Sequence, residues 1–235
     1  MTTKEVMAKL ESLGSEAGKN VFMIHGSTGK CFGVRVADLK VIMKQIKNEQ
    51  QLALDLYDTG VLDAMYLAGL VADGAKMTKK QIQDWVEKAT SYVISEYTVP
   101  WVAAESPWGR ELALEWMASK KDHVAAAGWN TMGVLVAVKE DSELDMKELK
   151  ALLEKVQKTI HEAPNRVRYT MNGFVISLGT YVSSLTAAAL EAGKKIGKVE
   201  VNMGDTYCKV PSSPEYIKKV KDAGRVGKKR KTFKC

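Results

Sequence analysis

Carboxylates and aromatic rings gather in the middle of the chain, where they could act on a positively charged group. Glu96 lies next to Tyr97, and Trp101 follows in the same predicted helical segment, 90–104. A carboxylate held in an aromatic pocket could stabilise the cationic sugar that develops when a glycosidic bond breaks. Glu96 is therefore a candidate catalytic residue, with Tyr97 beside it. The neighbouring acids Glu111 and Glu115 are better explained as a solvated helix face.

Other rings and guanidinium groups are candidate contacts to nucleic acid. Aromatic faces can stack on bases, and they attract a cationic alkylated purine. Large aromatic side chains are also highly buried on average, so packing in the core is the competing interpretation for each ring. For the arginines, an ordinary surface position is the alternative. The candidates are Trp101, Trp129, Arg166, Arg168 and Phe174.

The clearest charge feature is the C-terminal tail. From Lys218 to the end there are nine basic residues and one acid, a net charge of +8, and because the whole chain carries +7, the rest carries −1. The tail contains the run Lys228, Lys229, Arg230 and Lys231, which could neutralise phosphates and release their counterions. A disordered, solvated terminus is the alternative. Apolar Val226 and Phe233 flank the run and favour docking of the tail.

Other chemistries find little support in the sequence. Residues 25–30 are glycine-rich, but Lys30 is followed by Cys31, so the phosphate-loop pattern is incomplete and an ordinary loop is expected. The three cysteines and three histidines are scattered, which predicts neither a metal site nor a cofactor and fits a reducing cytoplasm. No apolar run approaches the ~20 residues that cross a bilayer, so no membrane partner is expected.

Helical periodicity dominates the chain. Ser106 and Pro107 indicate a helix start, and Trp108, Leu112 and Trp116 then form one stripe. Small residues at 125–128 would let a neighbouring helix approach closely. A kink or break is expected at Pro100. The predicted helices cover residues 3–14, 36–47, 49–58, 60–73, 78–88, 90–104, about 106–118, 122–138, 145–161, 165–182, 183–193 and 215–223.

Consecutive helix pairs without long linkers predict an all-α, HEAT-like helical-repeat solenoid over residues 1–201. Residues 202–235 would form an irregular segment and the basic tail. A compact helical bundle is the alternative architecture.

The order of segments resembles the DNA alkylation repair enzyme (AlkD-like) family of HEAT-like-repeat proteins. The resemblance rests on Phe32-Gly33-Val34-Arg35, Ser91-Tyr92, Ala125-Ala126-Ala127-Gly128-Trp129, Met171-Asn172-Gly173-Phe174, Cys208-Lys209-Val210-Pro211 and Gly227-Lys228-Lys229-Arg230-Lys231. It implies a C-shaped solenoid whose concave face holds DNA. In the family's active glycosylases that face carries a Ser-Trp-Trp-Asp-x-x-Asp-like helix and an arginine.

Ungapped matching from Ser91 places Tyr97 where the resemblance implies a catalytic aspartate, with Glu96 one residue away. The groove arginine falls near Met132, and a base-facing tryptophan falls at Phe174. The resemblance therefore implies binding to double-stranded DNA, including alkylated DNA, with or without the glycosylase chemistry. Two alternatives stay open: an active 3-/7-alkylpurine DNA glycosylase that uses Glu96 or another acid, and a protein-binding helical scaffold.

Overall fold

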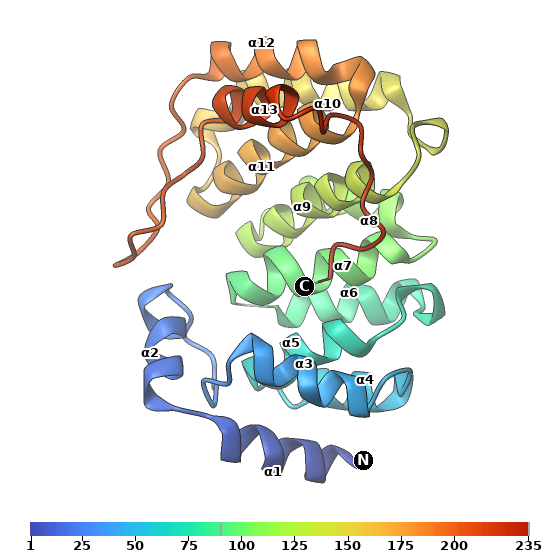
Figure 1. The fold of residues 1–235 in the computed structure, drawn as a ribbon, viewed down its shortest axis with the longest axis vertical. Coiled ribbons are helices and arrows are strands. Elements are labelled where there is room, and N and C mark those ends of the chain that lie inside the picture. The colour runs from blue at the N-terminus through green and yellow to red at the C-terminus, as the bar shows by residue number, and fades with distance from the viewer. Residues whose placement is uncertain (90, 235) are drawn as a thin grey trace. The chain divides into compact units, whose positions relative to one another are not determined.

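The computed structural model describes residues 1–89 and 91–234 (Figure 1). These residues form helices joined by turns and loops and contain no β-strand, so the predicted all-α fold class is confirmed. The α-helices are α1 (Thr3–Leu13), α2 (Glu16–Ile24), α3 (Val36–Gln45), α4 (Gln50–Asp58), α5 (Leu62–Val71), α6 (Lys79–Lys88), α7 (Val99–Glu105), α8 (Gly109–Met117), α9 (Asp122–Val138), α10 (Met146–Thr159), α11 (Asn165–Tyr181), α12 (Thr186–Ile196) and α13 (Ser213–Asp222).

Contacts within the described part of the chain divide it into two compact units. Unit 1 contains α1 to α7, the short segment Met203–Tyr207, and Lys234. Unit 2 contains α8 to α13 and the tail as far as Phe233. Among the described residues no single helix is long and apolar enough to cross a membrane. One pair, Asn165–Tyr181 with Ser183–Ile196, meets that test of length and composition only when joined, and it is bent by 115°.

Helix α5 is the core of unit 1, because every one of its residues is buried. It packs against α3, α4 and α7. Its one charged residue, Asp63, accepts hydrogen bonds from the backbone N–H groups of Phe32 (2.6 Å) and Val34 (2.8 Å). Two charge-assisted bonds offset the cost of burying a carboxylate. Asp63 therefore ties the loop between α2 and α3 to the core.

Unit 2 is built on the pair α8 and α9, which lie side by side (Figure 1). A Cβ atom at Gly128 would lie 2.6 Å from the backbone nitrogen of Met117 and 2.8 Å from the carbonyl oxygen of Ala113, so a glycine is needed for this approach. The close helix contact expected at 125–128 is confirmed at Gly128. On its other side α9 packs against α11, which also contacts α12 and α13.

The helix is not broken at Pro100, and the irregularity expected there takes the form of a π-helical segment in the preceding turn. Pro100 lies in the first turn of α7, and the irregularity comes before it, in a π-helical segment, Ile94–Thr98. A proline ring strikes the carbonyl group four residues earlier in a regular α-helix. The wider π-helical turn moves that carbonyl aside, and the chain continues in helical form.

The start of α8 also differs from the prediction. The helix begins at Gly109, so Trp108 precedes it and is 38% exposed, whereas Leu112 and Trp116 are buried as one stripe. Ser106 closes the preceding turn instead: its hydroxyl donates to the carbonyl oxygen of Ala103 (2.7 Å) and accepts from the backbone N–H of Trp108 (3.2 Å).

Helix α2 was not predicted from the sequence. None of its residues is buried, and its apolar side chains Val21, Met23 and Ile24 are exposed. Its hydrogen bonds explain why it forms: Ser15 accepts from the backbone N–H of Gly18 and donates to the carbonyl oxygen of Gly33. The glycine-rich residues 25–30 that follow form a loop, as expected, and the next helix begins only at Val36.

Candidate nucleic-acid interface

The candidate catalytic residues lie on the π-helical segment of unit 1, a kind of turn that is frequent at functional sites. Tyr97 and Tyr66 both face Trp101: the Tyr66 ring meets it edge-on with centroids 5.3 Å apart, and the Tyr97 ring lies 6.4 Å away. Glu96 and Trp101 are each 2% exposed. The structure thus encloses Glu96 and Trp101 inside the protein, whereas Tyr97 beside them is half-buried.

Ser91, which the family resemblance singles out, is also inside. Its hydroxyl lies 2.8 Å from the hydroxyl of Ser27, and both side chains are buried. This hydrogen bond joins the start of the π-containing helix to the glycine-rich loop at 25–30. Ser91 is therefore held by an interaction within unit 1.

Trp129 and Phe174 form a second aromatic pair, in unit 2. Their ring centroids are 5.5 Å apart, and the side chains are 2% and 0% exposed. Trp129 forms part of the wall of a cavity of about 290 Å³ between the α8–α9 and α10–α11 junctions. The amino group of Lys155 lies 5.9 Å from the Trp129 ring. Met132 lies near the position that the resemblance gives to the groove arginine, and its side chain is 2% exposed.

Arg166 and Arg168 lie in the first turn of α11 and are both half-buried. The Arg166 guanidinium group lies 4.5 Å from the centre of the Tyr169 ring, a cation–π contact. The Nε atom of Arg168 is buried and has no hydrogen-bond partner among the described residues. The pKa of the Glu200 carboxyl group is lowered, chiefly by its hydrogen bond to Lys198 and to a smaller extent by the charge of Arg168. The Arg166 guanidinium group therefore contacts a ring of its own helix, and the Arg168 side chain is covered at its Nε atom.

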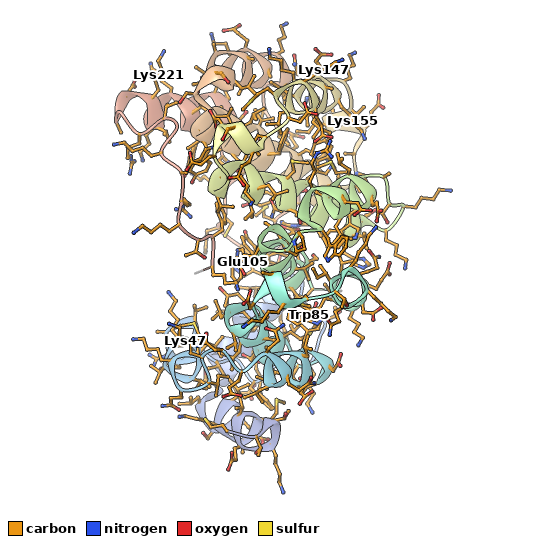
Figure 2. The ribbon with its side chains drawn as sticks, turned by 90° about the vertical axis from the view of Figure 1, so that its right-hand side faces the viewer. Lys47, Trp85, Glu105, Lys147, Lys155 and Lys221 are labelled. Atoms are coloured by element: carbon orange, nitrogen blue, oxygen red, sulfur yellow. The ribbon has the colours of Figure 1, made fainter. Side chains whose placement is uncertain are left out.

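The basic tail is docked, as its flanking apolar residues suggested. In unit 2, Lys229 forms an ion pair with Asp141 (2.8 Å), and its side chain is only 11% exposed. Arg230 stacks over the Phe233 ring at 4.9 Å. Lys228, Arg230 and Lys231 are exposed. In unit 1, Lys234 forms an ion pair with Glu105 (2.7 Å); Figure 2 labels Glu105.

The candidate residues inferred from the sequence did not include the loop between α12 and α13. Residues 197–212 run out and back without helix or strand (Figure 1). Near their turn lies Tyr207, whose relative exposure is 103%. A signal was present in the sequence, since a lone tyrosine among turn-forming residues has no apolar face to join.

A cavity of about 770 Å³ lies in unit 2, at the base of this loop. Its wall includes Lys194, Lys198 and Lys209, which come from α12, the outgoing arm and the returning arm. Lys194 pairs with Glu191 and Lys198 with Glu200, and all four side chains are at least 62% exposed. Such exposed pairs contribute little stability, so a phosphate could replace either glutamate. Within residues 1–89 and 91–234, no group of histidine, cysteine, aspartate or glutamate side chains is arranged to hold a metal ion.

Comparison with known proteins identifies the family. The sequence model of the DNA alkylation repair enzyme family matches residues 6–203. The chain belongs to this family. One solved structure is 35% identical, matches with a TM-score of 0.92 and covers 100% of both chains. It is described as representing a new family of proteins related to the HEAT-like repeat DNA glycosylases, with affinity for branched DNA structures. The predicted HEAT-like repeat fold is thereby confirmed.

Two bacterial relatives match over nearly their whole length. They are the uncharacterized proteins Lin0241 of Listeria innocua serovar 6a (29% identical) and Lmo0209 of Listeria monocytogenes serovar 1/2a (28% identical). Each alignment covers 94% of this chain and 98% of the relative. This member of the DNA alkylation repair family therefore has the same extent as these relatives and the same fold as the solved structure.

Proposed function

We propose that this member of the DNA alkylation repair family binds branched DNA through the phosphate backbone and an exposed aromatic ring, without excising a base. The observation that carries the proposal is the distribution of exposure. The rings of Trp101, Trp129 and Phe174 are at most 2% exposed, whereas Tyr207 is fully exposed. Base stacking requires an accessible ring face, and Tyr207 offers one.

The cations of unit 2 support a nucleic acid as the ligand. Lys194, Lys198 and Lys209 line the 770 Å³ cavity of that unit. The tail and α13 add further cations of unit 2, including Lys221, labelled in Figure 2. A cationic surface attracts the phosphate backbone irrespective of sequence. At a branch point, bases at the ends of the helical arms expose π-faces that a continuous duplex hides, which is where a projecting tyrosine could stack.

The similar protein of known structure also supports the proposal. The protein it represents has affinity for branched DNA, and the two chains match along their full length. The buried position of Glu96 supports the absence of excision, because a flipped base would have to reach a carboxylate that is 2% exposed.

The test is a titration of the purified protein with a fluorescent four-way junction and with a linear duplex of the same total length, followed by anisotropy. We expect tighter binding to the junction. The substitution Tyr207→Ala should weaken junction binding by about 5- to 100-fold, since stacking on one base contributes about 1–3 kcal/mol. Trp108→Ala is the matched control, because Trp108 is a 38% exposed ring of the same unit to which the proposal gives no role. Equal affinity for junction and duplex would reject branch recognition.

A second assay tests the absence of excision. Alkylated DNA is incubated with an excess of protein, and free 7-methylguanine is measured by chromatography. We expect no release above the rate without protein. Release by the natural chain that Glu96→Gln abolishes would establish the glycosylase alternative instead.

A further inference from the structure

The basic tail follows a fixed course over the C-terminal ends of α9 and α11. The backbone N–H of Gly227 donates to the carbonyl oxygen of Thr180, and that of Arg230 donates to the carbonyl oxygen of Ala137, each over 2.8 Å. Thr180 and Ala137 are the last residues but one of α11 and α9. Carbonyl groups in the last turn of a helix have no donor within the helix. The tail therefore supplies donors that the two helices need.

Gly227 allows the tail to come this close. Its φ angle is 75°, a conformation that other residues rarely adopt. A Cβ atom there would lie 2.2 Å from the hydroxyl oxygen of Ser183. The glycine that opens the basic run is thus a requirement for docking rather than a flexible hinge.

Lys229 points inward from the docked backbone. Its amino group donates to the carbonyl oxygen of Val136 (2.9 Å), in the last turn of α9, and pairs with Asp141 (2.8 Å). The C-terminus of a helix carries partial negative charge, which stabilises a cation there. All the polar contacts of the Lys229 side chain that the structure gives are therefore intramolecular, and the side chain is largely covered.

Four other cations of the tail are exposed to solvent. Arg225, Lys228, Arg230 and Lys231 are exposed, and Arg230 is supported from one side by the Phe233 ring. The backbone that carries them is held by the hydrogen bonds described above. Binding a polyanion would therefore not require this segment to be ordered first, which removes part of the usual cost of association.

We propose that Arg225, Lys228, Arg230 and Lys231 form a preordered phosphate-binding ridge, and that Lys229 is its anchor and not a DNA contact. This rests on the proposed function, because it assumes that the ligand is DNA. It departs from the expectation that a run of four basic residues acts as one unit. Lys229 instead differs from the other three members of the run, because it is the one whose side chain is covered in the docked tail.

The experiment compares the salt dependence of DNA affinity for three variants. The double variant K228Q/K231Q should lower the slope of log K against log salt by about 1.8, which is about 60-fold in affinity at 0.1 M salt, since each phosphate contact contributes a slope of about 0.9. K150Q/K158Q removes the same charge from exposed positions of α10 in the same unit and should leave the slope unchanged. K229Q should lower the melting temperature and leave the slope within about 0.5 of the natural value.

The outcomes separate the two proposals. Absence of DNA binding by the natural chain would overturn the proposed function and the ridge together. Binding with a steep slope that K228Q/K231Q does not change, or that K150Q/K158Q changes equally, would overturn the ridge alone. One outward lysine is expected to contribute about 0.9 to the slope. If K229Q lowers the slope by that amount, in protein that circular dichroism shows to be folded, the distinction between anchor and contact is overturned.

Discussion

Replacing Gly128 with alanine should push α8 and α9 apart. The added methyl group would sit 2.6 Å from the backbone nitrogen of Met117, and an ordinary contact begins near 3.4 Å, so the two backbones must separate by about 0.8 Å. No flexible side chain can move aside, because the nearest atoms are backbone atoms of α8. Overpacking of this kind costs about 1–3 kcal/mol. Alanine also favours the helix over glycine by about 0.8–1.0 kcal/mol, which offsets part of that cost.

Gly133 provides the matched control, because it lies in the interior of the same helix. A methyl group there would meet the Ser177 side chain at 3.4 Å and the Cα atom of Phe174 at 4.0 Å, which are ordinary contacts. Gly133→Ala gains the same helix propensity without the clash, so comparing the two variants cancels the propensity term. We expect Gly128→Ala to be about 1–3 kcal/mol less stable than Gly133→Ala, a difference of roughly 2–12 °C in melting temperature for a chain of this size.

The assay is thermal and urea unfolding of both variants, followed by tryptophan fluorescence. Trp116 lies in α8 and Trp129 in α9, so the signal reports on the helix pair. Equal stability of the two variants, with unchanged helix content, would show that the α8–α9 contact is not as close as the structure has it. The argument for glycine at this crossing would then be refuted.

Three further predictions concern buried or half-buried groups. Asp63→Asn keeps one acceptor but turns an amide toward the other N–H of the 32–34 loop, so urea unfolding should show a loss of about 2–4 kcal/mol; an unchanged midpoint would contradict this. Burial, and then the charge of Asp63, raise the pKa of the Cys31 thiol. Iodoacetamide near pH 8 should therefore modify Cys31 more slowly than the exposed Cys208, as peptide mass spectrometry would show. Burial raises the pKa of the Tyr57 phenol well above its usual 10, and its hydroxyl donates to the carbonyl oxygen of Trp85 (2.7 Å). Because the folded state holds this proton more tightly, Tyr57 favours folding fully below pH 10 and progressively less above it. Tyr57→Phe should cost about 1 kcal/mol at neutral pH and make alkaline unfolding less steep; an identical alkaline transition would argue against it.

Much of the fold could be predicted from the sequence, because buried helices repeat their apolar residues at helical spacing. The start of α10 shows this at one residue: Asp145 was expected to open the helix, and its side chain accepts from the backbone N–H groups of Lys147 and Glu148. Helix α2 escaped prediction because it buries none of its residues. Hydrogen bonds and close backbone packing around Gly18 and Gly33 hold it instead, and these contacts depend on the fold around it.

The candidate site was harder to predict for a different physical reason. Residue types showed that Glu96, Tyr97 and Trp101 could act together, but not that packing would enclose Glu96 and Trp101. Val226 and Phe233 indicated that the tail docks, but not where it docks, since the acceptors for Gly227, Lys229 and Arg230 include backbone carbonyl groups whose positions only the fold determines. The contact between Asp63 and the 32–34 loop is a case in which the sequence does carry a signal. Asp63 is the single acid in the otherwise apolar helix Leu62–Val71, and a buried carboxylate needs hydrogen-bond donors.

The π-helical turn at Ile94–Thr98 also changes how this helix should be compared with its relatives. A turn of this kind holds one residue more than the α-helical turn it replaces, so later side chains are rotated by about 100°. Suppose that a relative lacks the extra residue of this turn. Counting the same number of residues from Ser91 then reaches Tyr97 in this chain, but the residue at the equivalent place in space is the next one. That residue is Thr98, whose hydroxyl is fully enclosed and has no hydrogen-bond partner among the described residues. Superposition, and not counting along the chain, should therefore decide which side chain occupies the place that the resemblance gives to a catalytic aspartate.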